Sequence, residues 1–291
     1  MFENVIVGVA DLETGGDATA LALQLASNDR ALTLAYVQVV MAKPAPDAGD
    51  RSLAADRRHA FARLTPLHDQ ARDSRLVSVE ARSVAGGLHE LARRHQADLL
   101  VIAASRRDEY ERLVLGDDAR AVMENAPCPV AVAPIGYATR PTALMEVGAA
   151  YDGSAASRRA VAVARMVGRE RGAHVSAFDA IPVPIDAQDP ANPQPEIDRD
   201  LDRARRRMAA LGDVDPRAAA GDPEEEIQRY AASVDLLVVG SHRCRLIDHL
   251  TSGSLAQRLA DRSSYALLVL AGEANRHETA KGFVTPCPRS W

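Results

Sequence analysis

The sequence predicts an α/β protein of two tandem domains, each a five-stranded, doubly wound parallel sheet with helices on both faces. Three observations predict this class. The length of 291 residues suits two domains of about 100 to 200 residues each. Short apolar runs alternate with longer amphipathic segments, as expected for buried parallel strands joined by helices. Finally, the pattern of the first half recurs in the second.

The strongest recurrence is the segment ADLLVIA at 97–103, which reappears as VDLLVVG at 234–240, an offset of 137 residues. The same offset carries Gly116-Asp117 onto Gly253-Ser254, so the register holds without gaps over this stretch. At the front the offset is 142 residues: 5–10 falls on 147–152, and Ala35 falls on Ala177. A repeat of this length is a duplicated domain and not a solenoid unit.

Five strands are expected in each half, because each carries five short apolar runs. The expected strands are 5–9, 32–39, 76–81, 98–103 and 130–133, then 146–151, 174–180, 214–219, 235–240 and 266–270. Helical spacing of apolar residues marks 18–26, 53–71, 88–94 and 119–125 in the first half. We therefore expect a first domain at 1–138, a second at 142–272, and a poorly ordered tail at 273–291.

Composition argues against several classes of function. The net charge of −5 leaves no basic surplus for nucleic acid, and the arginines of 203–207 are balanced by nearby aspartates. No apolar run approaches the length of a membrane span, and no secretory signal is visible at the start. Cys128, Cys244 and Cys287 form no metal-type spacing, which favours a reduced, cytoplasmic setting.

Ligands of open parallel sheets bind beyond the carboxyl ends of the strands, where the strand order reverses. In the second half these ends carry Asp152-Gly153-Ser154 and Gly240. Asp152 could accept hydrogen bonds from a ribose or a base, and Gly240 lets a ligand approach the backbone. Gly253 and Ser254 open the next expected helix, whose free amides suit an anion. Together these groups describe a nucleotide site.

Each of these residues also has a purely structural explanation. Gly240 could only relieve crowding where strand meets loop, Ser254 could be a plain N-cap, and Asp152 could cap the turn before the helix at Ser157. The spacing of these residues favours a nucleotide site over the structural explanation, because Gly240-x2-Arg243-x9-Gly253-Ser254 has the lengths of a known motif.

That motif resembles the universal stress protein family, whose ATP-binding members carry G-x2-G-x9-G-(S/T) after strand four and an Asp at the end of strand one. The segments 221–227 and 125–130 are also similar to the family's turns, and the resemblance covers both halves. It implies a Rossmann-like fold of the adenine nucleotide α hydrolase type. It also implies ATP or a related adenine nucleotide as ligand, which Mg²⁺ could accompany.

Two departures from the motif bear on function. Arg243 replaces the second glycine, so its side chain could fill the pocket or pair with phosphate oxygens. The first half departs further: Ala10 stands where the strand-one Asp belongs, Asp11 comes one residue late, and Asp117 would repel phosphate. We expect the first site to be degenerate and empty.

The sequence thus predicts a stress-response regulator that binds an adenine nucleotide through Asp152, Gly153, Gly240, Arg243, Gly253 and Ser254. The alternative is a nucleotide-free scaffold that acts through protein partners. We expect no enzymatic activity, because the sequence has no Walker A lysine, H-E-x-x-H or G-x-S-x-G motif, although slow ATP hydrolysis stays open. The resemblance implies pairing through strand five, so we expect the two halves to pack pseudo-symmetrically within the chain. We also expect two chains to associate further as a homodimer.

Overall fold

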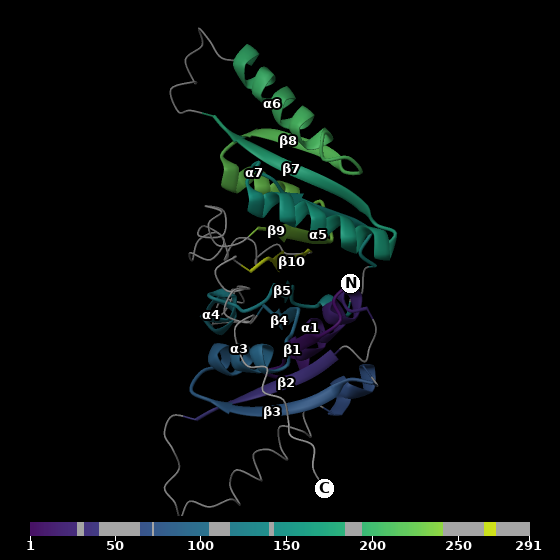
Figure 1. The fold of residues 1–291 in the computed structure, drawn as a ribbon, viewed down its shortest axis with the longest axis vertical. Helices are drawn as coiled ribbons and strands as arrows, with labels where there is room; N and C mark the ends of the chain where they lie inside the picture. The colour runs from purple at the N-terminus through teal and green to yellow at the C-terminus, as the bar shows by residue number, and fades with distance from the viewer. Residues whose placement is uncertain are drawn as a thin grey trace, which may run out of the picture.

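The computed structural model describes residues 1–27, 32–40, 65–71, 73–104, 117–139, 143–183, 194–240 and 265–271. Within these ranges the chain forms one ten-stranded sheet in the order β3-β2-β1-β4-β5-β10-β9-β6-β7-β8, which runs along the longest axis of the molecule (Figure 1). The strands are β1 (Val5–Gly8), β2 (Leu32–Val39), β3 (Arg75–Ala81), β4 (Leu99–Ala103), β5 (Val130–Ala133), β6 (Glu146–Ala150), β7 (His174–Pro182), β8 (Asp215–Gly221), β9 (Leu236–Val239) and β10 (Ala266–Val269).

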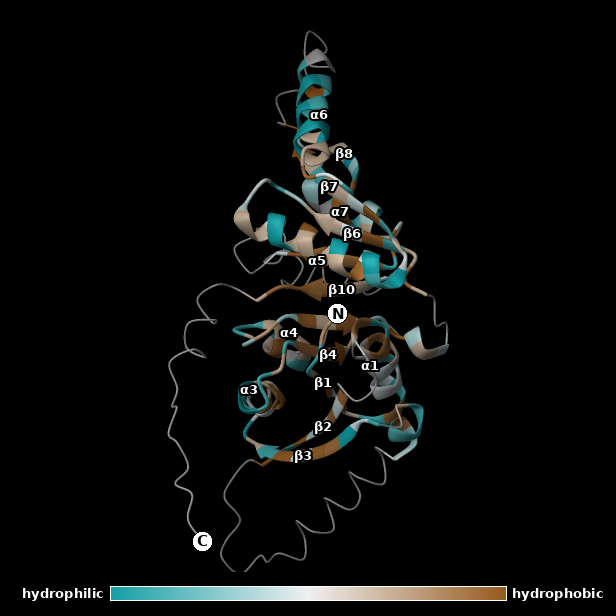
Figure 2. Cartoon of the chain, turned by 45° about the vertical axis from the view of Figure 1, so that its right-hand side comes forward, coloured by the Kyte–Doolittle hydropathy of each residue, from teal (hydrophilic) through white to brown (hydrophobic). Residues whose placement is uncertain are grey.

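Helices cover both faces of this sheet. The described helices are α1 (Leu12–Leu25), α3 (Val84–Arg94), α4 (Asp117–Met123), the short 3-10 helix η2 (Tyr137–Thr139), α5 (Ala155–Arg171), α6 (Gln194–Ala209) and α7 (Pro223–Ala231), together with a helical stretch at 65–70. Buried side chains of α1, α5 and α6 join one core, and those of α3, α4 and α7 join the other. Alternate residues of the central strands point into each core, as the two-residue period of a strand requires. Figure 2 shows the apolar strands at the centre and a largely hydrophilic α6 at the end of the second half.

The two halves meet edge to edge at their fifth strands. Strands are parallel within each half, whereas β10 pairs with β5 in antiparallel fashion, with Leu267 opposite Val132 and Val269 opposite Val130. The predicted pseudo-symmetric packing through strand five is therefore present within the chain. Because β5 and β10 pair with each other, neither strand has a free edge for a second chain. The outer edges of the sheet are β3 and β8.

All ten expected strands are present, and the α/β, doubly wound prediction is confirmed. The alignment of Ala35 with Ala177 was wrong. Ala35 lies opposite Gly8 and Phe178 lies opposite Ala150, so Ala35 corresponds to Phe178. The cause is one extra residue in the turn after β6, which the sequence alone did not place.

Some expected features lie wholly or partly outside the described residues. Of the helix expected at 53–71, the structure describes 65–71 and assigns 65–70 as helical. The tail at 273–291 lies outside the described ranges. None of the helices in those ranges has the length and apolar character that crossing a membrane requires.

Candidate functional site

The candidate site of the second half begins at the turn that follows β6. Ser154 is the N-cap of α5, and its side chain accepts a hydrogen bond from the Ser157 amide. Asp152 lies two residues earlier and accepts from the Ser154 amide at 2.8 Å. Gly153 between them has a φ of +83°, a conformation that glycine adopts without strain. The cap is thus Ser154, and Asp152 folds the turn that leads to it.

Hydrogen bonds keep the Asp152 carboxylate ionised. Partial burial raises its pKa, but hydrogen bonds from Ser154 and Ser157 outweigh this effect, and the pKa lies below its ordinary value. Asp152 is an exposed residue at the carboxyl end of β6. The position is the switch point of the second half, because β6 pairs with β7 on one side and β9 on the other.

Gly240, at the end of β9, packs tightly against the start of α5. A Cβ built on Gly240 would lie 2.8 Å from the Ala156 Cβ and 2.9 Å from its carbonyl carbon. The absence of a side chain therefore lets the first turn of α5 approach the end of β9. This packing accounts for the glycine without a ligand, so its role in nucleotide binding stays a prediction.

Arg207, Asp179 and Tyr151, which the sequence did not connect with the site, lie beside the Asp152 turn. The Arg207 guanidinium, from α6, makes an ion pair with Asp179 of β7 and lies 5.8 Å from the centre of the Tyr151 ring. A Cβ on Gly153 would lie 3.6 Å from Nη1 of Arg207. Burial raises the pKa of Asp179 despite the hydrogen bond from Arg207. The signal in the sequence was an aspartate inside the apolar run 174–180.

The structure brings Asp152, Gly153 and Gly240 to one end of adjacent strands. Arg243, Gly253 and Ser254 lie outside the described residues, as do Gly116 and Arg106, which the offset of 137 residues aligns with Arg243. Within the described ranges, no group of three or more His, Cys, Asp or Glu side chains is arranged to hold a metal ion.

The corresponding turn of the first half is one residue shorter. Asp11 is the N-cap of α1 and accepts a hydrogen bond from the Thr14 amide at 2.8 Å, which is the role of Ser154 in the second half. Because Asp11 is held as the N-cap of α1, it does not take the place of Asp152, and Ala10 stands at that position.

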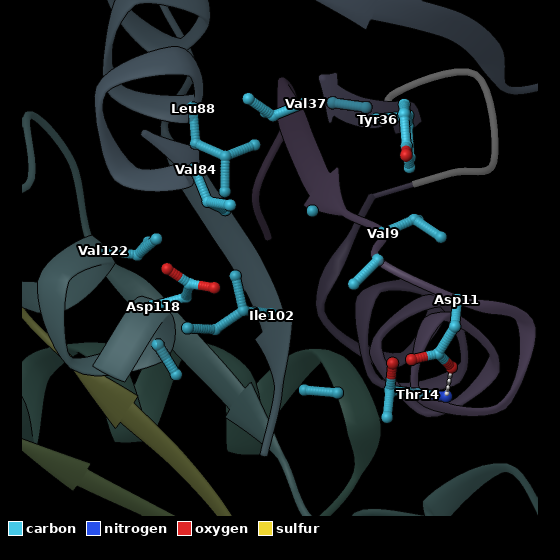
Figure 3. Close-up of a pocket in the computed structure, with 15 residues that line it drawn as sticks. Val9, Asp11, Thr14, Tyr36, Val37, Val84, Leu88, Ile102, Asp118 and Val122 are labelled. Atoms are coloured by element: carbon cyan, nitrogen blue, oxygen red, sulfur yellow. Dashed lines mark hydrogen bonds between the residues drawn. The ribbon is translucent and has the colours of Figure 1, made fainter. Parts of the chain in front are cut away.

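A pocket of about 230 Å³ opens at the strand ends of the first half (Figure 3). Its lining comes from the ends of β1 and β4, from the middle of β2, and from helices α1, α3 and α4. Most of its walls are apolar, and Asp11, Thr14, Tyr36 and Asp118 supply polar groups. The first half thus has a formed cavity where the sequence predicted only a degenerate site.

The family model described as "Universal stress protein family" matches residues 1–134 and 145–271. The chain belongs to this family. Its two matches coincide with the two halves of the sheet, so this is a tandem universal stress protein, as the resemblance predicted. No curated protein matches the sequence.

Two solved structures of this family share the architecture of the whole chain. One from Archaeoglobus fulgidus DSM 4304 is 12% identical, with 92% of this chain and 98% of that chain covered and a TM-score of 0.63. A Pseudomonas aeruginosa UCBPP-PA14 protein assigned to the same group is 16% identical, with 96% of each chain covered and a TM-score of 0.62. A universal stress protein in complex with cAMP is 28% identical over 45% of this chain and 98% of that one, with a TM-score of 0.31. Because their sequence identities to this chain are so low, the first two structures show a shared fold and nothing about ligands.

Proposed function

We propose that this universal stress protein is a regulator that binds ATP or a related adenine nucleotide in its second half. The observation that carries the proposal is the ionised Asp152 carboxylate at the switch point, one strand away from Gly240. Asp152 would accept hydrogen bonds from the ribose or the base. Gly253 and Ser254 would meet the phosphates, and Mg²⁺ would accompany a triphosphate.

Arg243 stands at the position of the motif's second glycine, and in this proposal its side chain pairs with phosphate oxygens. The Arg207 guanidinium, beside the Asp152 turn, is already engaged by Asp179. Arg243→Gly restores the family motif at this position. Weaker nucleotide binding in that variant would assign Arg243 to the phosphates, and stronger binding would mean that its side chain competes for the space.

Isothermal titration with ATP, AMP and GTP, each with and without Mg²⁺, tests the proposal. Two substitutions copy the first half into the second: Asp152→Ala copies Ala10, and Ser254→Asp copies Asp117. We expect saturable binding to the native protein. We expect Ser254→Asp to weaken it by about tenfold or more, because a carboxylate would face the phosphates.

The matched control is Asp117→Ser, which makes the reverse change in the first half. It should leave the affinity of the second site unchanged. Absence of any saturable heat or melting-temperature rise at millimolar ATP would refute the proposal.

A ligand-free scaffold is the second candidate, and one observation favours it. The space beside the Cα of Gly240 is taken by Ala156, and the Arg207–Asp179 ion pair lies over the turn at Gly153. Under this hypothesis the strand ends of the second half are held by protein contacts, and function resides on the surfaces. The same titration separates the two candidates.

We propose binding without turnover, in the cytoplasm. Release of phosphate from ATP above that of a Ser254→Ala variant would contradict binding without turnover.

Association of two chains stays a prediction, and it would have to use a surface other than β5 and β10. A molar mass from light scattering that equals one chain would refute it.

A further inference from the structure

The pocket of the first half has a buried apolar floor. Leu88 and Val122 are 1% exposed, Val9 is 5% exposed and Ile102 is 6% exposed. The volume of about 230 Å³ exceeds the cavity of roughly 150 Å³ that holds benzene. It is smaller than the range of about 300 to 1,000 Å³ that is typical for drug-sized ligands. The space therefore suits a small molecule with an apolar body, and not a nucleoside triphosphate.

Two carboxylates flank this apolar floor (Figure 3). Asp118 projects from α4 beside Ile102 and Val122, and Asp11 lies at the start of α1 on the other side. Asp118 is exposed and makes no hydrogen bond or ion pair with the residues that the structure describes. Asp11 uses one oxygen to accept from the Thr14 amide. Of the described lining residues, none is a lysine, arginine or histidine.

The walls that carry these groups are fixed by close contacts. The buried ring of His89 on α3 lies 2.8 Å from the Val122 carbonyl oxygen of α4. Burial lowers the pKa of His89, so the neutral ring donates this hydrogen bond through Nε2. A Cβ on Gly87 would lie 2.6 Å from Val37, so α3 also lies directly against β2. The pocket is thus preformed, which reduces the entropy cost of binding.

We propose that the first half binds a small amphipathic cation, an aromatic or short aliphatic amine, in this pocket. The apolar part of the ligand lies against Leu88, Ile102 and Val122. Its ammonium group lies at the mouth, between the carboxylates of Asp118 and Asp11. An anionic ligand of the same shape is rejected, because both carboxylates repel it.

Three probes of one shape test the charge: 2-phenylethylamine, the neutral 2-phenylethanol and the anionic 3-phenylpropanoate. In isothermal titration at low ionic strength, we expect the amine to bind roughly fivefold more tightly than the alcohol, as for an exposed ion pair. We expect no binding of the acid. Equal affinity for amine and alcohol, or no saturable binding of the amine at millimolar concentration, would overturn the proposal.

Matched variants locate the charge. Asp118→Asn should remove most of the preference for the amine over the alcohol. Glu124→Gln makes the same change of charge just beyond α4, outside the pocket lining, and should leave that preference intact. A preference that survives in Asp118→Asn would overturn the assignment of the ammonium site.

Isoleucine methyl NMR locates the ligand without any substitution. Amine binding should shift the methyl signal of Ile102, which lines the pocket, and leave that of Ile227 on α7 of the second half in place. Ala103→Leu should fill the cavity and abolish these shifts. Shifts confined to the second half would contradict the proposal, as would binding that persists in a folded Ala103→Leu protein.

Discussion

The strand ends of the two halves have the same topology but different packing. In the first half, the ends of β1 and β4 and the start of α1 enclose a pocket, and Ala103 lines it. In the second half, Gly240 takes the place of Ala103, and α5 begins in contact with it. Two changes accompany this difference: the methyl group of Ala103, which Gly240 lacks, and the extra residue in the turn after β6. A duplicated fold can therefore retain its strand register while the packing at its two sets of strand ends changes independently.

The largest expected effect concerns a carboxylate present in only one half. Asp17 of α1 is 2% exposed and accepts hydrogen bonds from the Gly136 and Ala138 amides, each at 2.8 Å. Counted from the two N-caps, the equivalent residue of α5 is Ala160. Asp17→Ala leaves two amides unpaired and should lower the free energy of unfolding by about 3 kcal/mol in urea denaturation.

The control for this variant is Glu13→Ala, an exposed acid on the same helix, which should change stability by less than about 0.5 kcal/mol. An equally small effect of Asp17→Ala would mean that the link from η2 to α1 does not depend on this carboxylate.

The second prediction tests the difference in packing directly. Gly240→Ala places a Cβ against Ala156 and should lower the free energy of unfolding by about 2 kcal/mol, because α5 must shift. Ala103→Gly, at the equivalent position, should cost no more than about 1 kcal/mol, since its methyl group lines a cavity. Thermal and urea denaturation measure both. Equal effects would contradict the proposed contrast.

The third prediction concerns a device that the halves share. Asp98 accepts from the amides of Glu3 and Asn4, and Asp235 accepts from those of Met145 and Glu146. Each carboxylate ties the start of the fourth strand of its half to that of the first strand. Substituting either by alanine should cost about 1.5 kcal/mol by urea denaturation. Effects that differ by more than about 1 kcal/mol would break the symmetry at this position.

The smallest effect concerns a contact between the halves. Arg171, the last residue of α5, donates to the carbonyl oxygens of Leu23, Gln24 and Ala26 at the end of α1. Helix α1 has no basic residue in its own last turn, so the second half supplies the cation there. Arg171→Gln should cost about 1 kcal/mol by thermal denaturation. Arg169→Gln, whose ion pair with Asp213 stays within the second half, should cost less.

The sequence by itself determined the duplication, the fold class, the ten strands and the family. It could do so because buried parallel strands are continuous apolar runs, and because the repeat preserves their spacing. It also placed Asp152 and Gly240 at the ends of adjacent strands, since parallel topology brings those ends together.

Only the tertiary structure decided how those ends are filled. The extra residue after β6, the role of Asp11 as an N-cap, and the contact between Gly240 and Ala156 depend on distances between elements far apart in the chain. The ion pair of Arg207 with Asp179 joins α6 to β7, and the pocket of the first half draws on six elements. The periodicity of apolar residues identifies each helix or strand separately. A cavity, by contrast, is a space that the side chains of several packed elements leave unfilled.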